Sequence, residues 1–440
     1  MGIFFGTDGV RGIVNNDLTE DLAQMVGNAL ARKKKNAKII VGRDTRVSGS
    51  FIVSAFSVGA LKGGANVIDV GIIPTAGLSY LVKNKKADYG VVISASHNPK
   101  EYNGIKVFDS DGRKLSEKEE TQLERYFCCP LVQSSIKVGR YKFVPSLANQ
   151  YERFLSSCTN VRFDSLKIVL DCANGAAYKI APKVFKNLGA EVVKINCLSS
   201  GKKINENCGA TNVAALQKKV LDCKADVGFA FDGDSDRVIA VDENGSILDG
   251  DMLIYILAKS LSKKGKLNSN TVVGTSHTNT GLLIALNRQK INLIRTDIGD
   301  KYVIEAMEKM NLSLGGEQSG HIILRSLLPT GDGILSAIKI CETLKESGGK
   351  ISRLFDAKLL HQLNKNIVVA DKLKILNSEM LSQKISQILS DIAPAGRVLV
   401  RASGTEPKIK YYLFLTEGEG GRKALEDNKG KILEEFKAAL

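Results

Sequence analysis

The chain has 440 residues, of which 43% are hydrophobic, so it is long enough for about three domains with sizeable cores. Its formal net charge is +15, but the basic residues are mostly scattered and the sequence contains no tryptophan. We therefore expect a solvated basic surface that attracts anionic small molecules, and no nucleic-acid-binding face.

Cysteine usage indicates the compartment in which the chain works. Of eight cysteines, Cys128 and Cys129 are adjacent, the others are dispersed, and no C-x-x-C pair occurs. This usage is typical of reduced thiols. No segment is apolar for long enough to cross a bilayer, and the opening "MGIFFGTDGVRG" lacks a signal-peptide pattern. We expect a cytoplasmic protein that does not contact a membrane.

Strand and helix patterns alternate along the first three quarters of the chain. Short apolar runs predict strands, and longer runs that end at glycine predict helices. The pattern gives strand 37–44, helix 48–64, strands 66–71 and 88–94, a strand-helix-strand unit over 166–196, helix 251–265, and strands 271–276 and 291–297. It predicts an α/β fold with mostly parallel strands, in three passes without a strict sequence repeat.

The last part of the chain follows a different pattern. Residues 364–376 and 396–417 are predicted to contain strands, 417–421 form a glycine-rich loop, and 422–440 are predicted to be a helix. We expect a smaller C-terminal α+β module here. No low-complexity linker precedes it, so the modules should pack closely.

A buried strand leads directly into a polar turn in "ADYGVVISASHNPKEYNGIKVF". The apolar run 91–93 fits a strand buried on both faces, and Pro99 forces the chain to turn. Ligands of open α/β sheets bind at the carboxyl ends of the strands. Ser96 is therefore a candidate nucleophile, with His97 and Lys106 as nearby proton handlers or charges. The alternative is an ordinary polar turn.

Three carboxylates follow another predicted strand, in "GFAFDGDSDRVIAVDENG". Asp232, Asp234 and Asp236 would repel one another unless a cation lies among them, and oxygen ligands indicate Mg²⁺ or Ca²⁺. An EF-hand loop is a competitor, because Glu243 falls at its twelfth position. Arg237 stands where that loop needs glycine, and the preceding segment resembles a strand, so we favour Mg²⁺ with a phosphoryl partner. A solvated acidic turn is the remaining alternative.

Two later motifs suggest ligand contacts. In "LGGEQSGHI", Glu317, Ser319 and His321 follow two glycines that would let the backbone approach a ligand, although a glycine-rich turn explains the pattern as well. The second motif, "VRASGTEPKI", combines an arginine fork, two hydroxyls and free amides in one predicted phosphate cradle; the alternative is a surface turn. Its residues are Arg401, Ser403, Gly404 and Thr405.

Further arginines and histidines have weaker signals. Arg11, Arg43 and Arg46 are each candidates to face an anion, in "GTDGVRG" and "GRDTRVSG". His277 and His361 are interpreted as structural or surface histidines.

Taken together, six ordered motifs carry a resemblance to a known family. They are "GTDGVRG", "SASHNP", "NGIKVF", "DGDSDR", "GGEQSGH" and "RASGTEP". Over essentially its whole length the chain resembles the α-D-phosphohexomutases. The resemblance implies four domains around a central cleft, the first three of them similar α/β units. The expected boundaries are 1–150 with the phosphoserine loop, 151–252 with the metal loop, 253–363 with the sugar-binding loop, and 364–440 as the C-terminal phosphate-binding α+β domain.

The resemblance also implies roles for the motifs. Ser96 would be the phosphoserine, and its phosphate would join Asp232, Asp234 and Asp236 in binding one Mg²⁺. The "GEQSG" motif, with Glu317 and Ser319, would contact the sugar, and "RASGTEP" would bind the phosphate that is not transferred. Two positions depart from the usual pattern without loss of polar character: Lys301 stands where arginine is commoner, and Asn212 stands where histidine is usual.

Within the family, Gln318 in "GGEQSGH" and the opening "FGTDGVRG" favour the bacterial enzymes that act on glucosamine phosphates. These interconvert glucosamine 6-phosphate and glucosamine 1-phosphate, with a sugar 1,6-bisphosphate as intermediate or activator, and supply UDP-N-acetylglucosamine and cell-wall precursors. Arg11 and Arg237 would add positive charge at the moving phosphoryl group. Lys106, His97 and His321 are candidates for general acid and base, a lysine of lowered pKa being plausible in a cationic cleft.

Two alternatives stay open at this point. The same machinery serves phosphomannomutases and phosphoglucomutases, which act on other sugar phosphates. A non-catalytic protein that binds Ca²⁺ or a sugar phosphate belongs to a different class; Ser96 argues against it, because a pure binder needs no nucleophile. The expected partners are small sugar phosphates, and a homodimer is compatible with the resemblance.

Overall fold

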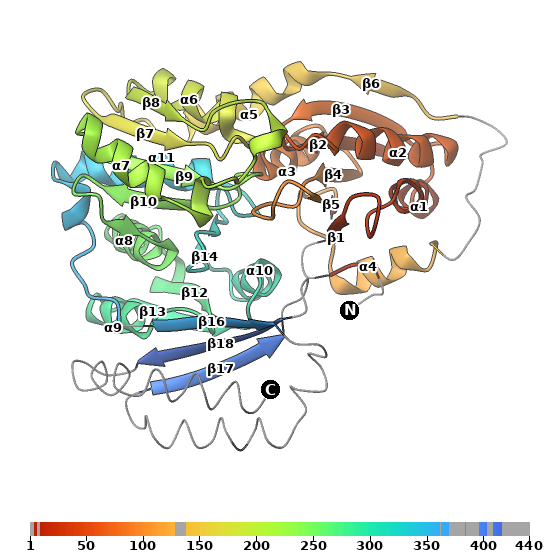
Figure 1. The fold of residues 1–440 in the computed structure, drawn as a ribbon. Coiled ribbons are helices and arrows are strands. Elements are labelled where there is room, and N and C mark those ends of the chain that lie inside the picture. Colours follow the sequence, from red (N-terminus) through yellow and green to blue (C-terminus); the bar gives the residue numbers. More distant parts are fainter. Residues whose placement is uncertain are drawn as a thin grey trace. The chain divides into compact units, whose positions relative to one another are not determined.

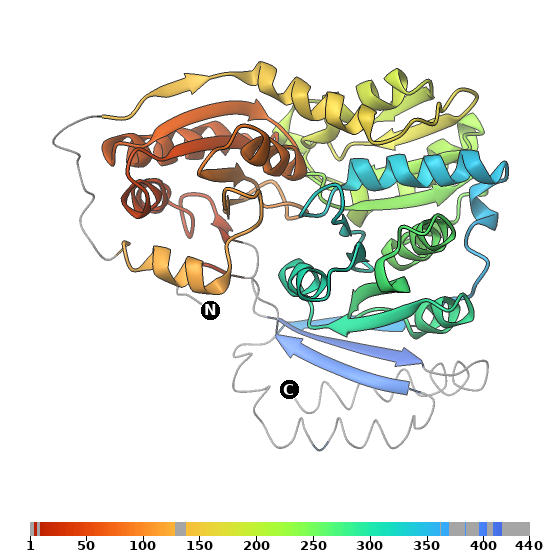
Figure 2. The ribbon, with the colours of Figure 1, turned by 180° about the vertical axis from the view of Figure 1, so that it is seen from behind.

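The computed structural model describes residues 4–6, 9–127, 138–360, 362–368, 383, 396–402 and 408–415 (Figure 1). These residues form two compact units. The first unit contains the described residues up to His277 together with Ile291–Phe355. The second contains Thr278–Lys290 together with the described residues from Asp356 onward. Three separate β-sheets with flanking helices make up the first unit (Figures 1 and 2).

The first sheet has the strand order β1-β5-β4-β2-β3-β6. Its strands are β1 (Val10–Ile13), β2 (Lys38–Arg43), β3 (Asn66–Ile72), β4 (Tyr89–Ile93), β5 (Tyr102–Phe108) and β6 (Tyr141–Phe143). The neighbouring helices are α1 (Glu20–Lys33), α2 (Gly49–Lys62), α3 (Thr75–Asn84), α4 (Glu117–Glu124) and α5 (Ala148–Ser157). Strands β4, β2, β3 and β6 are parallel, whereas β5 is antiparallel to both β4 and β1.

Helices cover both faces of this sheet because successive side chains of a strand point to opposite faces. Ile39 and Val41 of β2 belong to a buried cluster that includes Phe56 of α2. Gly42 lies on the other face, where an added Cβ would come within 3.1 Å of Leu78 in α3. The result is a three-layer α/β/α arrangement.

The second sheet has the order β11-β10-β9-β7-β8. Its strands are β7 (Lys167–Asp171), β8 (Glu191–Ile195), β9 (Val227–Phe231), β10 (Val238–Asp242) and β11 (Ile247–Leu248), and its helices are α6 (Ala177–Asn187) and α7 (Ala214–Cys223). Strand β7 is parallel to β8 and β9, and β10 is antiparallel to β9 and β11. Phe185 of α6 stacks on Phe229 with the ring centroids 6.1 Å apart, while Leu216 of α7 packs with Val169.

The third sheet has the order β13-β12-β14-β15. Its strands are β12 (Thr271–Thr275), β13 (Asn292–Thr296), β14 (Leu314–Gly316) and β15 (Ile322–Leu324), and the helices of this region in the first unit are α8 (Gly250–Lys263), α10 (Asp300–Lys309) and α11 (Gly333–Ser347). Strand β12 is parallel to β13 and β14, whereas β15 is antiparallel to β14. Short 3₁₀ helices occur at Pro145–Leu147, Gly201–Lys203, Gly209–Thr211, Asn268–Asn270 and Ile351–Arg353.

The α/β class is confirmed, but the sheets are mixed rather than purely parallel. Each of the three sheets contains an antiparallel hairpin of the same kind. In each sheet the chain leaves a buried strand, forms a short loop and returns beside that strand: β4 to β5, β9 to β10, and β14 to β15. The connecting loops are residues 94–101, 232–237 and 317–321. These are the motifs that the sequence selected, so the polar residues belong to three equivalent hairpin loops.

The second unit contains helix α9 (Thr280–Arg288) and the strands β16 (Gln362–Val368), β17 (Gly396–Ala402) and β18 (Lys408–Leu415). The strands form an antiparallel sheet in the order β16-β18-β17. The predicted loop 417–421 and helix 422–440 lie outside the described residues. Within the part of the chain that the structure describes, no helix combines the length and apolar character needed to cross a membrane.

Candidate active site

The β4–β5 loop carries the candidate nucleophile. Ser96 is almost completely buried and has a φ of +50°, a left-handed conformation that costs a non-glycine residue roughly 1 kcal/mol or more. Its hydroxyl donates a hydrogen bond to Oδ2 of Asp232 at 2.5 Å, and Nδ1 of His97 lies 3.4 Å from the same hydroxyl oxygen. The fold thus brings Ser96 directly against the carboxylate loop of the second sheet.

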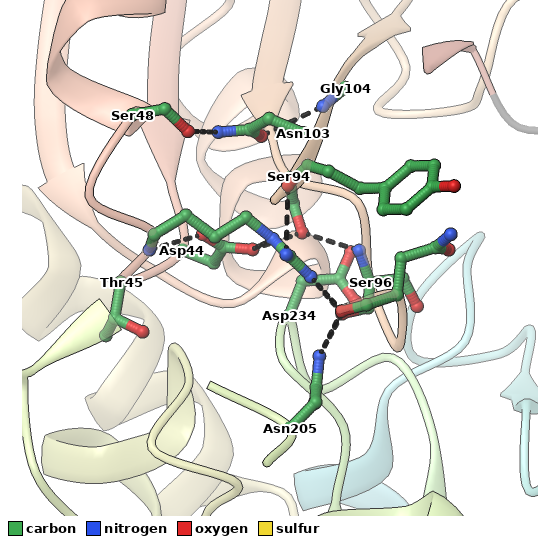
Figure 3. Close-up of polar contacts among 12 residues, drawn as sticks. Asp44, Thr45, Ser48, Ser94, Ser96, Asn103, Gly104, Asn205 and Asp234 are labelled. Carbon is green, nitrogen blue, oxygen red and sulfur yellow. Dashed lines mark hydrogen bonds and ion pairs between the residues drawn. The ribbon is translucent and has the colours of Figure 1, made fainter. Parts of the chain in front are cut away.

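The backbone amide of Ser96 is held by a chain of polar groups (Figure 3). The amide donates to Oγ of Ser94 at 2.9 Å, and this hydroxyl donates to Oδ2 of Asp44 at 2.6 Å. Burial raises the pKa of Asp44 above its usual value, against the opposing effect of the Arg46 guanidinium. Ser94 and Asp44 therefore fix the direction in which the Ser96 peptide points.

The guanidinium of Arg46 holds the same loop through hydrogen bonds to the loop's backbone carbonyl groups. Its Nε donates to Oδ2 of Asp44 at 3.0 Å. The four remaining N–H groups donate to the carbonyl oxygens of Ser96, Asn98, Pro99 and Tyr102 at 2.5–2.9 Å. An arginine has five N–H donors, and all of them are used here. The prediction that Arg46 could face an anion is therefore wrong, because its guanidinium is a buried scaffold of the loop.

Two further hydrogen bonds to this loop come from the second sheet's domain. Asn205, which follows the 3₁₀ helix Gly201–Lys203, donates from Nδ2 to the carbonyl oxygens of Ser96 and Asn98 at 2.8 and 3.0 Å. Figure 3 shows it approaching Ser96 from a separate segment of the chain.

The β9–β10 loop is held by backbone hydrogen bonds from its surroundings. The carbonyl groups of Gly233, Asp234 and Ser235 accept from the amides of Ala176, Thr75 and Gly333, respectively, at 2.8–3.0 Å. Gly233 itself has no room for a side chain, since a Cβ there would come within 2.5 Å of the Ser96 carbonyl oxygen.

The three carboxylates of this loop form a candidate metal centre. Ligand oxygens of Asp232, Asp234 and Asp236 all lie within 4.8 Å of one another, and all three residues are buried. Among the described residues, Oδ1 of Asp234 and Oδ1 of Asp236 find no hydrogen-bond partner. Buried, unsatisfied carboxylate oxygens at this spacing fit a hard cation such as Mg²⁺.

The EF-hand alternative does not fit the fold. Residues 238–242 form strand β10, and Glu243 beyond it accepts a hydrogen bond from the hydroxyl of Ser352 at 2.5 Å. Its carboxylate is therefore engaged away from the three aspartates.

Lys106 of β5 balances part of this negative charge. Its Nζ lies 2.9 Å from Oδ2 of Asp234 and 3.6 Å from Oδ2 of Asp236, and the side chain is 1% exposed. The expected cationic surrounding is not what the structure shows, because the nearest charged groups are carboxylates. A buried ammonium needs such partners to offset its desolvation.

The environments of the two outer carboxylates differ. Burial raises the pKa of Asp232 well above its usual range, and the charges of Asp236 and Asp234 raise it further. Burial also opposes ionisation of Asp236, but Lys106 and His321 hold the pKa of Asp236 well below its usual value. Asp236 therefore ionises more readily than Asp232.

The third hairpin loop joins the second through His321. An isolated β-bridge pairs His321 with Arg237, and Nδ1 of His321 lies 3.6 Å from Oδ2 of Asp236. Nε2 of the same ring lies 3.6 Å from Oδ2 of Asp300, which also pairs with Lys114. Although burial opposes protonation, Asp236 and Asp300 raise the pKa of His321 above its usual value.

The sugar-binding candidates occupy the tip of this third loop. Glu317 is half-buried and its Oε1 accepts from the amide of Gly299 at 3.1 Å, while Ser319 is exposed. Gln318, the residue used to favour glucosamine phosphates, donates to Asp249, the N-cap of α8, at 3.1 Å.

The remaining candidate residues are placed as follows. Arg11 on β1 donates from Nη1 to Oδ1 of Asn98 at 3.0 Å, beside the Ser96 loop. The Arg237 side chain is 23% exposed, with Nε 3.9 Å from Oδ1 of Asp236. Arg401 lies on β17, but its side chain is outside the described part of the structure, as are Ser403, Gly404, Thr405 and His361.

Sequence reasoning missed several residues that build the site. Asp44 and Ser94 lie inside the quoted motifs "GRDTRVSG" and "SASHNP" but were assigned no role, and Thr75, whose hydroxyl donates to Oδ2 of Asp234 at 2.6 Å, is the first residue of α3. Asn205 had no signal at all. The hint for Asp44 and Arg46 was "GRDTR" at a strand end, where the acid and the second arginine are two residues apart.

Comparison with known proteins now places the chain in a class. Sequence models of all four domains described as phosphoglucomutase/phosphomannomutase match it: α/β/α domain I over residues 2–128, domain II over 143–245, domain III over 249–360 and the C-terminal domain over 365–433. The chain belongs to this family, as the resemblance to the α-D-phosphohexomutases predicted.

Individual relatives narrow the comparison. Proteins named phosphoglucosamine mutase from Pelotomaculum thermopropionicum and Thermoanaerobacter sp. are 44% and 45% identical to this chain; each alignment covers 93% of this chain and 94% of the relative. A phosphoglucomutase/phosphomannomutase family protein from Burkholderia thailandensis has the same fold, with a TM-score of 0.82 at 22% identity over 99% of this chain and 97% of its own. An Aspergillus fumigatus N-acetylphosphoglucosamine mutase, solved with GlcNAc-6P and magnesium, gives a TM-score of 0.67 at 18% identity over 100% of this chain and 96% of its own.

Proposed function

We propose that this protein interconverts glucosamine 6-phosphate and glucosamine 1-phosphate through a phosphorylated Ser96. The observation that carries the proposal is the Ser96 hydroxyl, 2.5 Å from one carboxylate of a buried three-aspartate group. A nucleophilic oxygen beside a candidate cation site is the arrangement that phosphoryl transfer requires. The named relatives at 44–45% identity support glucosamine as the sugar.

The reaction balances as two phosphoryl transfers. In the first, the bond from phosphorus to Ser96 Oγ breaks and a bond to O1 of glucosamine 6-phosphate forms, giving the 1,6-bisphosphate. After the bisphosphate reverses its orientation, Ser96 Oγ accepts the phosphoryl group from O6, and glucosamine 1-phosphate leaves. The sugar hydroxyl loses a proton in the first transfer and O6 gains one in the second, so the net reaction consumes none.

Three residues near the reacting groups are candidates to handle that proton, and two arginines are candidates to neutralise charge. His97 lies against the Ser96 hydroxyl, and Lys106 and His321 lie against the carboxylates. We assign general acid and base roles to this set, and charge neutralisation to Arg11 and Arg237.

Asp232, Asp234 and Asp236 would hold the Mg²⁺, together with the phosphate on Ser96. When bound, the ion neutralises charge on the transferring phosphoryl group. The hydrogen bond from Thr75 and the ion pair from Lys106 both engage Oδ2 of Asp234, so Oδ1 would be the oxygen available to the ion.

Substrate binding is assigned to two loops. Glu317 and Ser319 would bind the sugar hydroxyls or the amine. The distal phosphate would be bound by the loop that contains Arg401, Ser403, Gly404 and Thr405. Because that loop would bind one phosphate before reorientation and the other afterwards, loss of Arg401 should impair both directions of the reaction. The position in the cytoplasm and a homodimeric state remain predictions.

A coupled assay with the 1-phosphates of glucosamine, glucose and mannose tests the sugar assignment, with glucose 1,6-bisphosphate as activator. We expect glucosamine 1-phosphate to give the highest kcat/KM. A higher value for glucose or mannose 1-phosphate would instead make the protein a phosphoglucomutase or phosphomannomutase with the same machinery.

Chelation tests the cation. EDTA should abolish turnover, and added Mg²⁺ should restore it. Full activity in excess EDTA would refute the metal assignment, and absence of turnover with all three sugars would favour a binding protein.

A further inference from the structure

The peptide groups of the Ser96 loop receive hydrogen bonds from two different domains. The carbonyl oxygen of Ser96 accepts from Nη2 of Arg46 at 2.9 Å and from Nδ2 of Asn205 at 2.8 Å. The carbonyl oxygen of Asn98 accepts from the same two nitrogens, at 2.8 and 3.0 Å. A carbonyl oxygen has two lone pairs, so both acceptors are saturated.

We propose that Asn205 is a positioning residue for the nucleophile. It would act from the second sheet's domain by fixing the peptide that carries Ser96, so that the serine hydroxyl stays directed at Asp232. The inference rests on the proposed function only in taking Ser96 as the phosphorylated residue.

Ser96 needs such support because of its backbone conformation. A φ of +50° is unfavourable for serine and persists only where the surroundings enforce it. Arg46 supplies one half of the enforcement from the serine's own domain. Without the second donor, only Arg46 would oppose rotation of the peptide after Ser96 toward a more favourable φ, and Oγ would move with that rotation.

Asn205 is itself well fixed to the second domain. Its amide donates to the carbonyl oxygen of Ala173 at 3.0 Å, and its φ of +57° is a conformation that asparagine tolerates better than most residues. An asparagine here satisfies two needs at once: a left-handed backbone and a side chain with two N–H donors.

Gly233 shows that the space around this contact is fully used. An added Cβ at that position would come within 2.5 Å of the Ser96 carbonyl oxygen and 3.1 Å of Asn205 Nδ2. The metal loop, the serine loop and Asn205 therefore meet at one point, and the orientation of Ser96 depends on the placement of the second domain.

The test compares Asn205→Gly with Asn207→Gly. Both asparagines lie in the same loop with positive φ, at +57° and +52°, so glycine fits both backbones. Asn207 is exposed and is the matched control. We expect Asn205→Gly to lower kcat about ten-fold, as two neutral hydrogen bonds are lost, with KM unchanged within two-fold. Asn207→Gly should leave both unchanged.

A second variant separates positioning from space filling. Asn205→Asp keeps the shape of the side chain but turns a carboxylate oxygen toward two carbonyl oxygens. We expect it to lower kcat further than Asn205→Gly does, whereas a residue that only fills space would tolerate aspartate. Thermal unfolding should show that all three variants are folded at the assay temperature, with Asn205→Asp the least stable because its carboxylate faces two carbonyl oxygens. A kcat within two-fold of wild type for both Asn205 variants would overturn the proposal.

Phosphorylation of Ser96 is a readout that does not depend on which sugar phosphate the enzyme prefers as its substrate. The rate at which glucose 1,6-bisphosphate phosphorylates Ser96, followed by intact mass, should fall about ten-fold in Asn205→Gly and remain unchanged in Asn207→Gly. If the wild type is phosphorylated but turns over no glucosamine phosphate, the proposed function fails while this comparison still decides the role of Asn205. A wild type that is never phosphorylated at Ser96 would overturn both.

Discussion

The two hairpin loops that meet at the candidate active site are held in different ways. The serine loop is fixed mainly by side chains, the guanidinium of Arg46 and the amide of Asn205. The aspartate loop is fixed by backbone amides of Thr75, Ala176 and Gly333. Substitutions remove side-chain donors but rarely backbone ones. The serine loop should therefore be sensitive to loss of the side-chain donors around it, and the aspartate loop should tolerate such losses.

The largest expected effect comes from the serine loop itself. Ser96→Ala removes the oxygen that carries the phosphoryl group, so kcat should fall by at least about a thousand-fold. The fold should be retained, because the change lies in a loop. Turnover near that of the wild type in a folded Ser96→Ala variant would refute the covalent route.

Gly233→Ala tests the point where the two loops touch. The new Cβ would lie 2.5 Å from the Ser96 carbonyl oxygen, so one loop must move. We expect kcat to fall about a hundred-fold, since small displacements of reacting groups are costly. Gly349→Ala is the control, because only Ser347 Oγ, at 3.8 Å, lies near its new Cβ. Equal kinetics for the two variants would contradict the close contact.

Arg46→Lys weakens the side-chain support of the serine loop without removing its charge. Lysine has three donors in place of five and cannot reproduce the planar fork. We expect kcat to fall about ten-fold and the free energy of unfolding to fall by roughly 3 kcal/mol. Chemical denaturation and steady-state kinetics measure the two quantities. A variant as active and as stable as the wild type would show that the five hydrogen bonds are dispensable.

Thr75→Val makes the corresponding change on the aspartate loop. It removes the hydroxyl that donates to Asp234 but keeps the backbone amide that donates to the Asp234 carbonyl oxygen. The loop should stay in place, and we expect kcat to fall only about three-fold. A loss larger than that of Arg46→Lys, in parallel assays, would reverse the proposed difference between the loops.

Asp332→Asn should leave activity unchanged and alter only stability. Asp332 caps α11, whose first amide, that of Gly333, anchors the aspartate loop, and it accepts from the hydroxyl of Tyr151 at 2.7 Å. Burial raises the pKa of Asp332 from 3.8 to about 6. The folded state then binds this proton more tightly than the unfolded state, so the contribution to stability is largest below pH 3.8 and is lost as the pH rises to 6.

The shift corresponds to roughly 3 kcal/mol, and asparagine cannot titrate. The stability of the wild type relative to Asp332→Asn should therefore increase as the pH is lowered from about 7.5 to 5. Denaturation of both proteins at the two pH values gives this difference directly. A pH-independent difference would contradict the raised pKa.

The sequence allowed prediction of what depends on local pattern. Apolar runs marked the strands β2, β3, β4, β7 and β9, and the polar residues after β4 and β9 marked the loops of Ser96 and Asp232. The antiparallel pairing of β5 with β4 was missed. The composition of "NGIKVF" is typical of any strand and does not indicate which strand it pairs with, or in which direction.

The contacts between distant segments could not be predicted. An arginine at the end of a strand has the same donors for an anion as for carbonyl groups, so Arg46 was assigned to the wrong partner. Asn205 lies 109 residues from Ser96 along the chain, and nothing local to it indicates its target. Lys106 was recognised as relevant, but its carboxylate neighbours come from another sheet.

The backbone anchoring of residues 232–235 also bears on which ion this loop can select. Four consecutive carbonyl oxygens, those of Asp232, Gly233, Asp234 and Ser235, accept hydrogen bonds from protein amides. Calcium sites commonly include backbone carbonyl oxygens among their six to eight ligands. Mg²⁺ is usually bound by one or a few carboxylates, with phosphate and water as the remaining ligands. Each of these hydrogen bonds uses one lone pair of a carbonyl oxygen, so the loop has less free backbone oxygen to offer than a calcium loop, and the proposed preference for Mg²⁺ would follow from ligands that are already engaged.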